Sequence, residues 1–135
     1  MAEGLHKESI RLLRHLRQVD ERTGLSPARL SVLSILVFAG PGSPGDLARA
    51  EQVKPPTMTR LLQGLAEDGL VVLIPDPGDG RGKRVKATDK GRRLMKKARE
   101  ARLEPLMADL GSLEAHEFRA LNQAVDILKS ILMEK

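Results

Sequence analysis

Eleven lysines and arginines are concentrated in residues 81–102, where only Asp89 and Glu100 oppose them. This stretch carries a formal charge of +9, whereas the other 113 residues sum to −4 and the whole chain to +5. Guanidinium and ammonium groups gathered in one place bind polyanions, and phosphate backbones in particular. The alternative interpretation is a solvated helix face, because lysine and arginine are ordinary surface residues.

The rest of the composition narrows the kind of polyanion. Tryptophan and tyrosine are absent from the 135 residues, and Phe38 and Phe118 are the only phenylalanines. Single-stranded nucleic acid is usually bound by stacking its bases on aromatic side chains, so duplex DNA is the better candidate. The sequence also has 41% hydrophobic residues, no apolar stretch long enough to span a membrane, no secretory signal and no cysteine. We therefore expect a soluble, cytoplasmic, nucleoid-associated protein with one core.

Helix-start signals divide the first half of the sequence into helices. Apolar residues at helical spacing predict a helix over residues 5–22, which Gly24 ends. Ser26-Pro27 and Ser43-Pro44 are typical of an N-cap followed by proline in the first turn. They predict a second helix that stops at residues 40–42 and a short third helix that runs to about residue 50. A fourth helix begins at residue 55 or 56 and ends near Gly69, with an apolar stripe formed by Met58, Leu61, Leu62 and Leu65.

A hairpin and two long helices follow. Residues 70–74 form an apolar run too short for a helix, residues 76–82 are rich in glycine, and residues 84–87 provide a return strand. Thr88 is suited to cap a fifth helix, which Pro105 must kink or break, and a last helix begins at about residue 114. The expected fold is mostly α with a small β-hairpin wing. Its order is that of a winged helix-turn-helix, in which the second helix of the pair reads the major groove.

This arrangement resembles the MarR (multiple antibiotic resistance regulator) family of dimeric transcription factors from about residue 25 to residue 91. The pieces that carry the resemblance occur in the family's order and at its spacing. They are Gly24-Leu25-Ser26-Pro27 with Val32-Leu33, then Leu47-Ala48, residues 53–62, Leu65 with Gly69-Leu70-Val71, the turn Asp76-Pro77-Gly78-Asp79-Gly80-Arg81, and Thr88-Asp89-Lys90-Gly91.

The resemblance implies two DNA-binding elements. In the wing, Arg81 matches the arginine that enters the minor groove and Asp79 the acid that orients it, with Lys83 and Arg84 as further contacts. The cations of residues 92–97 are secondary candidates. Thr57 and Thr59 are equally suited to hydrogen bonds at a helix start. The contacts expected from the recognition helix are Lys54, Pro55, Pro56, Thr57, Thr59, Arg60 and Gln63.

Three positions depart from the family's pattern. Lys54 stands where a Ser or Asp helix cap is usual, so the helix start lacks a side-chain acceptor worth ~1 kcal/mol. Gly80 replaces the first arginine of the usual wing pair, and Gly64 replaces a polar residue on the outward face of the fourth helix. These changes bear on the strength and sequence preference of DNA binding rather than on the fold.

Apolar stripes on the terminal helices need a partner. A second copy of the chain would bury the same stripe twice, and the resemblance implies such a homodimer. We therefore predict a single domain, residues 1–135, with a DNA-binding core at 25–88 and dimerisation helices at 1–24 and 89–135. Met95 and Met107 are candidates for lining an effector pocket, although a methionine on an apolar stripe is usually core. The expected dimer contacts are Leu5, Leu12, Leu16, Leu121, Val125, Leu128 and Leu132.

Two enzyme-like patterns fail on their chemistry. Residues 40–45 match G-x-G-x-x-G, but Pro41 and Pro44 have no amide hydrogen to offer a pyrophosphate. Residues 78–83 resemble a phosphate loop that is one residue short, and Arg84 occupies the place of its metal-binding Ser or Thr. His6 and His15 are nine residues apart on one predicted helix and His116 lies on another, so the three form no H-x-x-x-H zinc-binding pair. We expect no catalysis, no metal and no cofactor.

The predicted function is a sequence-specific, double-stranded DNA-binding transcription regulator. We expect a repressor that binds a palindromic operator as a homodimer. The resemblance also implies release by a small aromatic or anionic effector. The alternative from another class is a winged-helix module that binds proteins or coats DNA without specificity.

Overall fold

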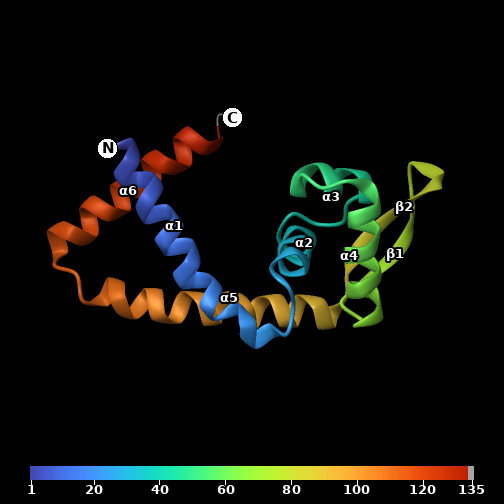
Figure 1. Cartoon of the computed structure of the whole chain (residues 1–135), viewed down its shortest axis with the longest axis horizontal. Coiled ribbons are helices and arrows are strands. Elements are labelled where there is room, and N and C mark those ends of the chain that lie inside the picture. Colours follow the sequence, from blue (N-terminus) through green and yellow to red (C-terminus); the bar gives the residue numbers. More distant parts are fainter. Residues whose placement is uncertain (134–135) are drawn as a thin grey trace. The chain divides into compact units, whose positions relative to one another are not determined.

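The computed structural model describes residues 1–133, with the backbone alone at residues 79–81. Its elements are α1 (Ala2–Gln18), the 3-10 turn η1 (Asp20–Thr23), α2 (Pro27–Phe38), α3 (Pro44–Glu51), α4 (Pro55–Glu67), β1 (Val71–Asp76), β2 (Asp79–Ala87), α5 (Asp89–Gly111) and α6 (Ala115–Met133) (Figure 1). The chain divides into two compact units, Met1–Arg102 and Leu103–Lys135, and α5 runs from the first into the second.

The predicted starts of α2 and α3 are confirmed. Ser26 Oγ accepts a hydrogen bond from the backbone N–H of Arg29 at 3.3 Å, and Ser43 Oγ accepts one from Asp46 at 3.1 Å. A proline occupies the first turn of both helices, where its missing N–H leaves no intrahelical bond unmade. The glycine- and proline-rich residues 40–45 therefore connect two helices, with the serine serving as a cap.

The predicted first helix is instead two elements. α1 ends at Gln18, and the chain tightens into η1. The Thr23 hydroxyl donates to the carbonyl of Asp20 at 2.7 Å and accepts from the amide of Leu25 at 3.1 Å, while Gly24 takes a φ of 74°. Threonine side chains compete with regular helix hydrogen bonds in this way. The Asp20 side chain is consequently buried, with the residue 8% exposed.

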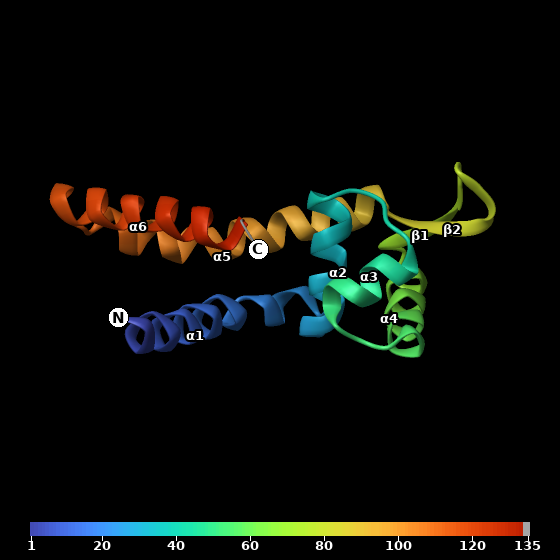
Figure 2. The ribbon, with the colours of Figure 1, turned by 90° about the horizontal axis from the view of Figure 1, so that it is seen from above.

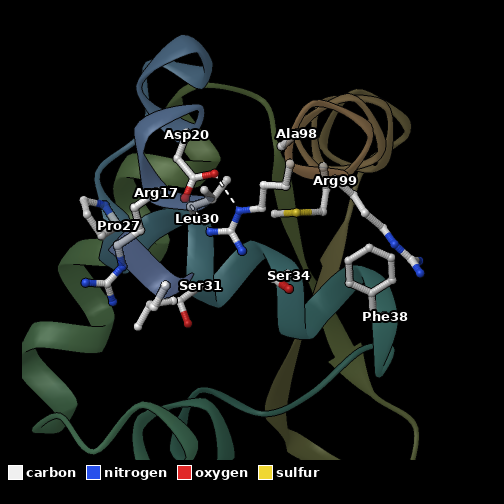
Figure 3. A pocket seen from close by; sticks show the side chains of 12 residues that line it. Arg17, Asp20, Pro27, Leu30, Ser31, Ser34, Phe38, Ala98 and Arg99 are labelled. Carbon is white, nitrogen blue, oxygen red and sulfur yellow. Dashed lines mark hydrogen bonds and ion pairs between the residues drawn. The ribbon is translucent and has the colours of Figure 1, made fainter. Parts of the chain in front are cut away.

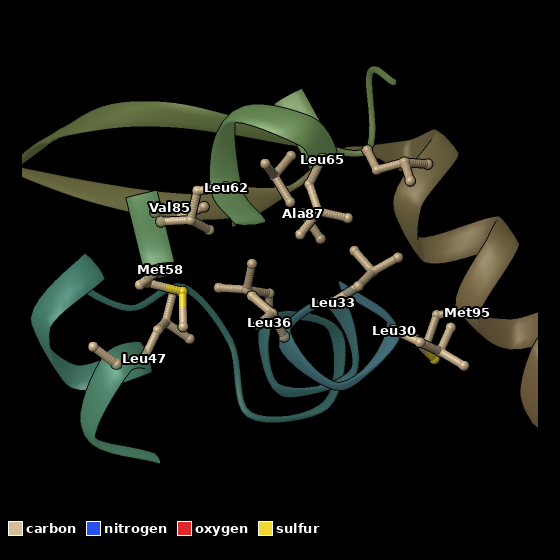
Figure 4. Packing of buried hydrophobic residues seen from close by; sticks show 14 of the residues in the cluster. Leu30, Leu33, Leu36, Leu47, Met58, Leu62, Leu65, Val85, Ala87 and Met95 are labelled. Carbon is tan, nitrogen blue, oxygen red and sulfur yellow. The ribbon is translucent and has the colours of Figure 1, made fainter. Parts of the chain in front are cut away.

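The core of the first unit surrounds α2 (Figure 4). Leu33 and Leu36 lie between side chains of α4, such as Leu65, and of the hairpin, such as Val85, and α5 adds Met95. Burying a large apolar side chain stabilises by ~1.5–3 kcal/mol, so this packing fixes α4 and the hairpin against α2. The buried cluster is Leu30, Val32, Leu33, Leu36, Leu47, Ala48, Met58, Leu62, Leu65, Leu70, Val71, Val85, Ala87, Met95 and Ala98.

The hairpin is a wing whose base is tied to the helix-turn-helix. β1 and β2 pair antiparallel from Val71 opposite Ala87 to Asp76 opposite Asp79, with a register shift after Pro75. β2 starts five residues before the predicted residue 84, because the pairing continues along the glycine-rich turn. Gly42 and Val85 add a bridge, with N–H to O distances of 3.1 Å and 2.7 Å. The loop between α2 and α3 thus borders the wing.

The last two helices are simpler. α5 continues through Pro105, so of the predicted kink or break the break does not occur, although a proline removes one intrahelical hydrogen bond. α6 starts at Ala115, next to the predicted residue 114, and has no buried residue. In residues 1–133, no helix is both long and apolar enough to cross a membrane.

Candidate nucleic-acid interface

α4 is built to present a polar face. Its apolar stripe anchors the helix on the core, with Met58 at 1%, Leu62 at 4% and Leu65 at 0% exposure. The opposite face carries the predicted major-groove contacts, which remain predictions of DNA contact. All of them are exposed: Lys54, Pro55, Pro56, Thr57, Thr59, Arg60 and Gln63.

The first turn of α4 lacks a side-chain cap, as predicted. Lys54 is the N-cap residue and makes no capping hydrogen bond through its side chain, and Pro55 follows in the first turn. The Thr59 hydroxyl donates to the carbonyl of Pro55 at 3.0 Å, so the helix-start role considered for this residue is confirmed. Its oxygen can still accept a hydrogen bond from DNA.

Gly64 does not lie on the outward face, and that prediction is wrong. It is buried, and the guanidinium of Arg29 from α2 covers it. Arg29 was not identified from the sequence as part of the site. The signal available was a glycine inside a helix, which usually has a packing reason.

The cations of the wing differ in their exposure and contacts. Lys83 is exposed, whereas Arg84 is half-buried and its Nη2 donates to the carbonyl of Pro41 at 2.8 Å. Arg84 therefore ties the wing to the loop between α2 and α3. The side chains of Asp79 and Arg81, the predicted minor-groove pair, lie outside the described residues, and their contacts stay predictions.

In α5, two cations of the basic run of residues 81–102 hydrogen-bond to backbone carbonyls. Lys90 Nζ donates to the carbonyl of Asp68 at 2.8 Å, and Arg92 Nη1 donates to that of Ala87 at 3.0 Å. Arg92 also donates a hydrogen bond to Asp89. This bond and the positive charge of Arg92 lower the pKa of the Asp89 carboxyl. These cations hold α5 against the end of α4 and the end of the wing. Over residues 83–102, the exposed cations are Lys83, Lys86, Lys90, Arg92, Arg93, Lys96, Lys97 and Arg99.

Arg102, the last cation of the run, is paired inside the first unit. Its Nε donates to Asp20 Oδ1 at 2.7 Å and its Nη2 to Asp20 Oδ2, so the two groups form a bidentate pair. The hydrogen bond to this carboxylate raises the pKa of Arg102. The pair joins η1 to α5 across 82 positions of sequence, and no sequence pattern marked it.

A cavity of about 620 Å³ opens beside this pair, bounded by α1, α2 and α5 (Figure 3). Three guanidinium groups and one carboxylate lie on its wall, and Arg99 stands 5.2 Å from the centre of the Phe38 ring. Met95 lines the cavity, as proposed for an effector pocket, whereas Met107 belongs to the second unit. The lining is Leu13, Arg17, Asp20, Pro27, Leu30, Ser31, Ser34, Phe38, Met95, Ala98, Arg99 and Arg102.

A short helix pair whose second helix exposes a polar face, followed by a hairpin tied to the pair, defines a winged helix-turn-helix protein. Residues 23–82 match the MarR family. An HTH-type transcriptional regulator of Mycobacterium bovis is 37% identical over 134 residues, which cover 99% of this chain and 94% of that protein. The chain belongs to the MarR family of DNA-binding transcription regulators, which are not enzymes.

Two further relatives agree with this assignment. The structure of a mutant MarR from E. coli superimposes with a TM-score of 0.80 at 25% identity, covering 98% of this chain and 96% of that one. The transcriptional repressor IacR of Pseudomonas putida is 25% identical over 118 residues, which cover 87% of this chain and 71% of the repressor. The predicted fold class, mostly helical with a hairpin wing, is confirmed.

Proposed function

We propose that this protein is a homodimeric repressor that binds a palindromic operator in chromosomal DNA. In this proposal α4 contacts the bases and the wing binds the phosphate backbone of the DNA. The exposed polar face of α4, opposite the buried Met58, Leu62 and Leu65, carries the proposal. Arg60 and Gln63 on that face have the side chains that pair with guanine and adenine edges in the major groove. Figure 2 shows the wing extending beyond α4 within the same unit.

Uncovered apolar faces support the dimer. α1 and α6 contain no buried residue. Leu5 is 50% exposed, Leu12 47%, Leu121 44%, Val125 55% and Leu132 70%, while Leu16 and Leu128 are half-buried. A two-fold axis would bury each stripe twice and set two α4 helices about one DNA turn apart, ~34 Å. Sedimentation at micromolar concentration should therefore give a dimer, and a monomer would contradict this arrangement.

Two variants separate base reading from backbone binding. Arg60→Ala should reduce the preference for operator over random duplex, because a bidentate base contact is worth ~1–3 kcal/mol of discrimination. Arg81→Ala should weaken both duplexes alike and flatten the plot of log affinity against log salt by about 0.9 for each phosphate that Arg81 neutralises. Equal losses of affinity on both duplexes for Arg60→Ala would remove it from base reading, and an unchanged salt slope for Arg81→Ala would remove it from phosphate binding.

The regulatory sign is proposed from the repressor of Pseudomonas putida, which is similar over most of this chain. A reporter gene placed behind the DNA upstream of the protein's own gene tests it. Repression predicts that deletion of the protein raises reporter expression. A fall in expression after deletion would indicate activation.

The cavity beside Asp20 supports release by a small aromatic acid. Its arginines outnumber its carboxylate, and its apolar lining includes Leu13, Leu30 and Phe38, so a planar ring with one negative charge fits its chemistry. A ligand at 100 times its dissociation constant stabilises the protein by ~2.7 kcal/mol. Thermal shifts should appear with benzoate, be absent with the neutral benzamide, and shrink in Arg99→Gln. Equal shifts with both compounds would contradict an anion site.

The second candidate, a protein-binding or non-specific DNA-coating module, keeps one observation in its favour. Lys54 leaves the start of α4 without a side-chain cap, so the recognition helix is less firmly fixed than a capped helix. Footprinting on the upstream DNA separates the two functions. A symmetric protected site supports the repressor, whereas uniform protection, or none, supports the module.

A further inference from the structure

Gly64 forms a notch in the last turn of α4, and a side chain from another helix fills it. A Cβ built on Gly64 would lie 2.8 Å from Nε of Arg29 and still closer to its Cζ and Nη2. Real Cβ atoms essentially never approach another heavy atom so closely, so the guanidinium occupies the space that a side chain at residue 64 would need. The absence of a side chain lets α2 reach the backbone of α4 directly.

Arg29 interacts with its surroundings through both its backbone and its side chain. Its backbone N–H donates to the N-cap serine of α2, Ser26, at 3.3 Å. Its Nη1 lies 3.8 Å from Oδ2 of Asp68, the residue that caps the end of α4. The Arg29 side chain is 38% exposed, so the guanidinium is partly sheltered against the helix. The planar guanidinium of Arg29 thus lies between the backbone at Gly64 and the carboxylate of Asp68.

We propose that Arg29, seated on Gly64, is a positioning residue that sets the rotation of α4 and thereby its reading of bases. This inference rests on the proposed role of α4 as the recognition helix. Arg60 lies four residues before Gly64, one turn along the same side of the helix. A small rotation of α4 about its axis is amplified at the end of a long side chain, and bidentate base contacts depend on such geometry.

A direct phosphate contact by Arg29 is the competing role, and the geometry disfavours it. The guanidinium faces the backbone of α4 and the carboxylate of Asp68, which partly neutralises it. The two roles give opposite results in one experiment. A phosphate contact contributes to the salt slope and weakens all duplexes alike, whereas a positioning contact changes the operator preference and leaves the slope unchanged.

The experiment uses the full chain and two duplexes: the sequence that the unaltered protein selects from a random pool, and an unselected duplex of equal length. Gly64→Ala displaces the guanidinium while keeping its charge, and Arg29→Ala removes it. Each variant should lower the ratio of selected to unselected affinity by about tenfold, as mutations that shift coupled elements do. The double variant should be no worse than either single variant, because both remove one contact.

Two controls separate this effect from loss of structure. Gly45→Ala makes the same exchange in the first turn of α3, where an added Cβ would come no closer than 3.8 Å to a neighbouring side chain, and should leave the affinity ratio unchanged. Alanine favours a helix more than glycine does, so Gly64→Ala should not lower the thermal midpoint enough to unfold the protein at the assay temperature. The affinity ratio, measured on folded protein, is a readout that a purely structural role would not move.

The outcomes are distinct. An unchanged ratio in Gly64→Ala, or a salt slope reduced by about one in Arg29→Ala, overturns the positioning role. If Arg60→Ala lowers the ratio while Gly64→Ala does not, this inference alone fails. If Arg60→Ala leaves the ratio unchanged, the recognition role of α4 fails and the inference fails with it.

Discussion

Replacing Asp20 by asparagine should lower the free energy of unfolding by about 2 kcal/mol. Breaking a fully buried ion pair by removing one partner costs ~3–5 kcal/mol, whereas an exposed pair is worth ~0–1 kcal/mol. The Asp20 side chain is 11% exposed and that of Arg102 35%, which places this pair between the two limits. After the change, Arg102 keeps a neutral acceptor and partial access to water, and this limits the penalty.

Thermal unfolding followed by circular dichroism is the appropriate assay, since the chain has neither Trp nor Tyr to report by fluorescence. For 135 residues the entropy of unfolding is ~0.28 kcal/mol per degree, so the midpoint should fall by about 7 °C. Protein concentration must be matched, because unfolding of a dimer depends on it. Glu21→Gln, an exposed acid in the same turn, is the matched control and should shift the midpoint by about 1 °C or less.

The reasoning is refuted if Asp20→Asn costs less than about 0.5 kcal/mol, the range of ordinary surface substitutions. A double variant with Arg102→Met gives a second check. Once both charges are gone no group is left buried without its partner, so the double variant should be more stable than the sum of the single losses predicts. Strict additivity would mean that the two side chains do not stabilise each other.

Three further changes test the elements around the interface. Gly91→Ala should destabilise the protein by about 2 kcal/mol in urea unfolding. The new Cβ would lie 3.1 Å from the carbonyl carbon of Leu70 and closer to its oxygen, and these backbone atoms cannot move aside. A neutral effect would contradict this close approach. Lys54→Ser should stabilise by about 1 kcal/mol in thermal unfolding, because α4 gains a capping oxygen, and an unchanged or lower midpoint would show that the serine does not cap the helix. Arg84→Ala should cost about 1 kcal/mol in the same urea assay through its bond to Pro41, and a similar loss in the exposed control Lys83→Ala would argue against this tie.

Local signals in the sequence located the elements well. Ser26 and Ser43 each precede a proline, and both cap the helices predicted for them, because capping needs only residues within one turn. Gly69 ends α4 with a φ of 72°, a conformation that glycine adopts without strain. The alternation of apolar and turn residues likewise placed the hairpin, although not its full length.

Contacts between distant residues could not be predicted in the same way. The pair of Asp20 with Arg102 requires that η1 turn inward, and this depends on the Thr23 hydrogen bonds and on the packing of α5. Helical periodicity assigned Gly64 to the solvent-exposed face because it uses the sequence of one helix and contains no information about neighbouring helices. The structure places the neighbouring helix over that position, so a side chain on α2 decides its environment.

The charge of residues 81–102 is therefore a poor guide to the number of phosphate contacts. If each of its eleven cations neutralised one phosphate, the run alone would give a salt slope of about −10 per protomer. Arg84, Lys90, Arg92 and Arg102 hydrogen-bond to protein acceptors, which compete with phosphate for the same donors. The remaining seven cations set an upper limit of about −6. A larger contribution of the run to the measured slope would require that DNA binding pull these four cations away from the contacts that hold the wing and α5 in place.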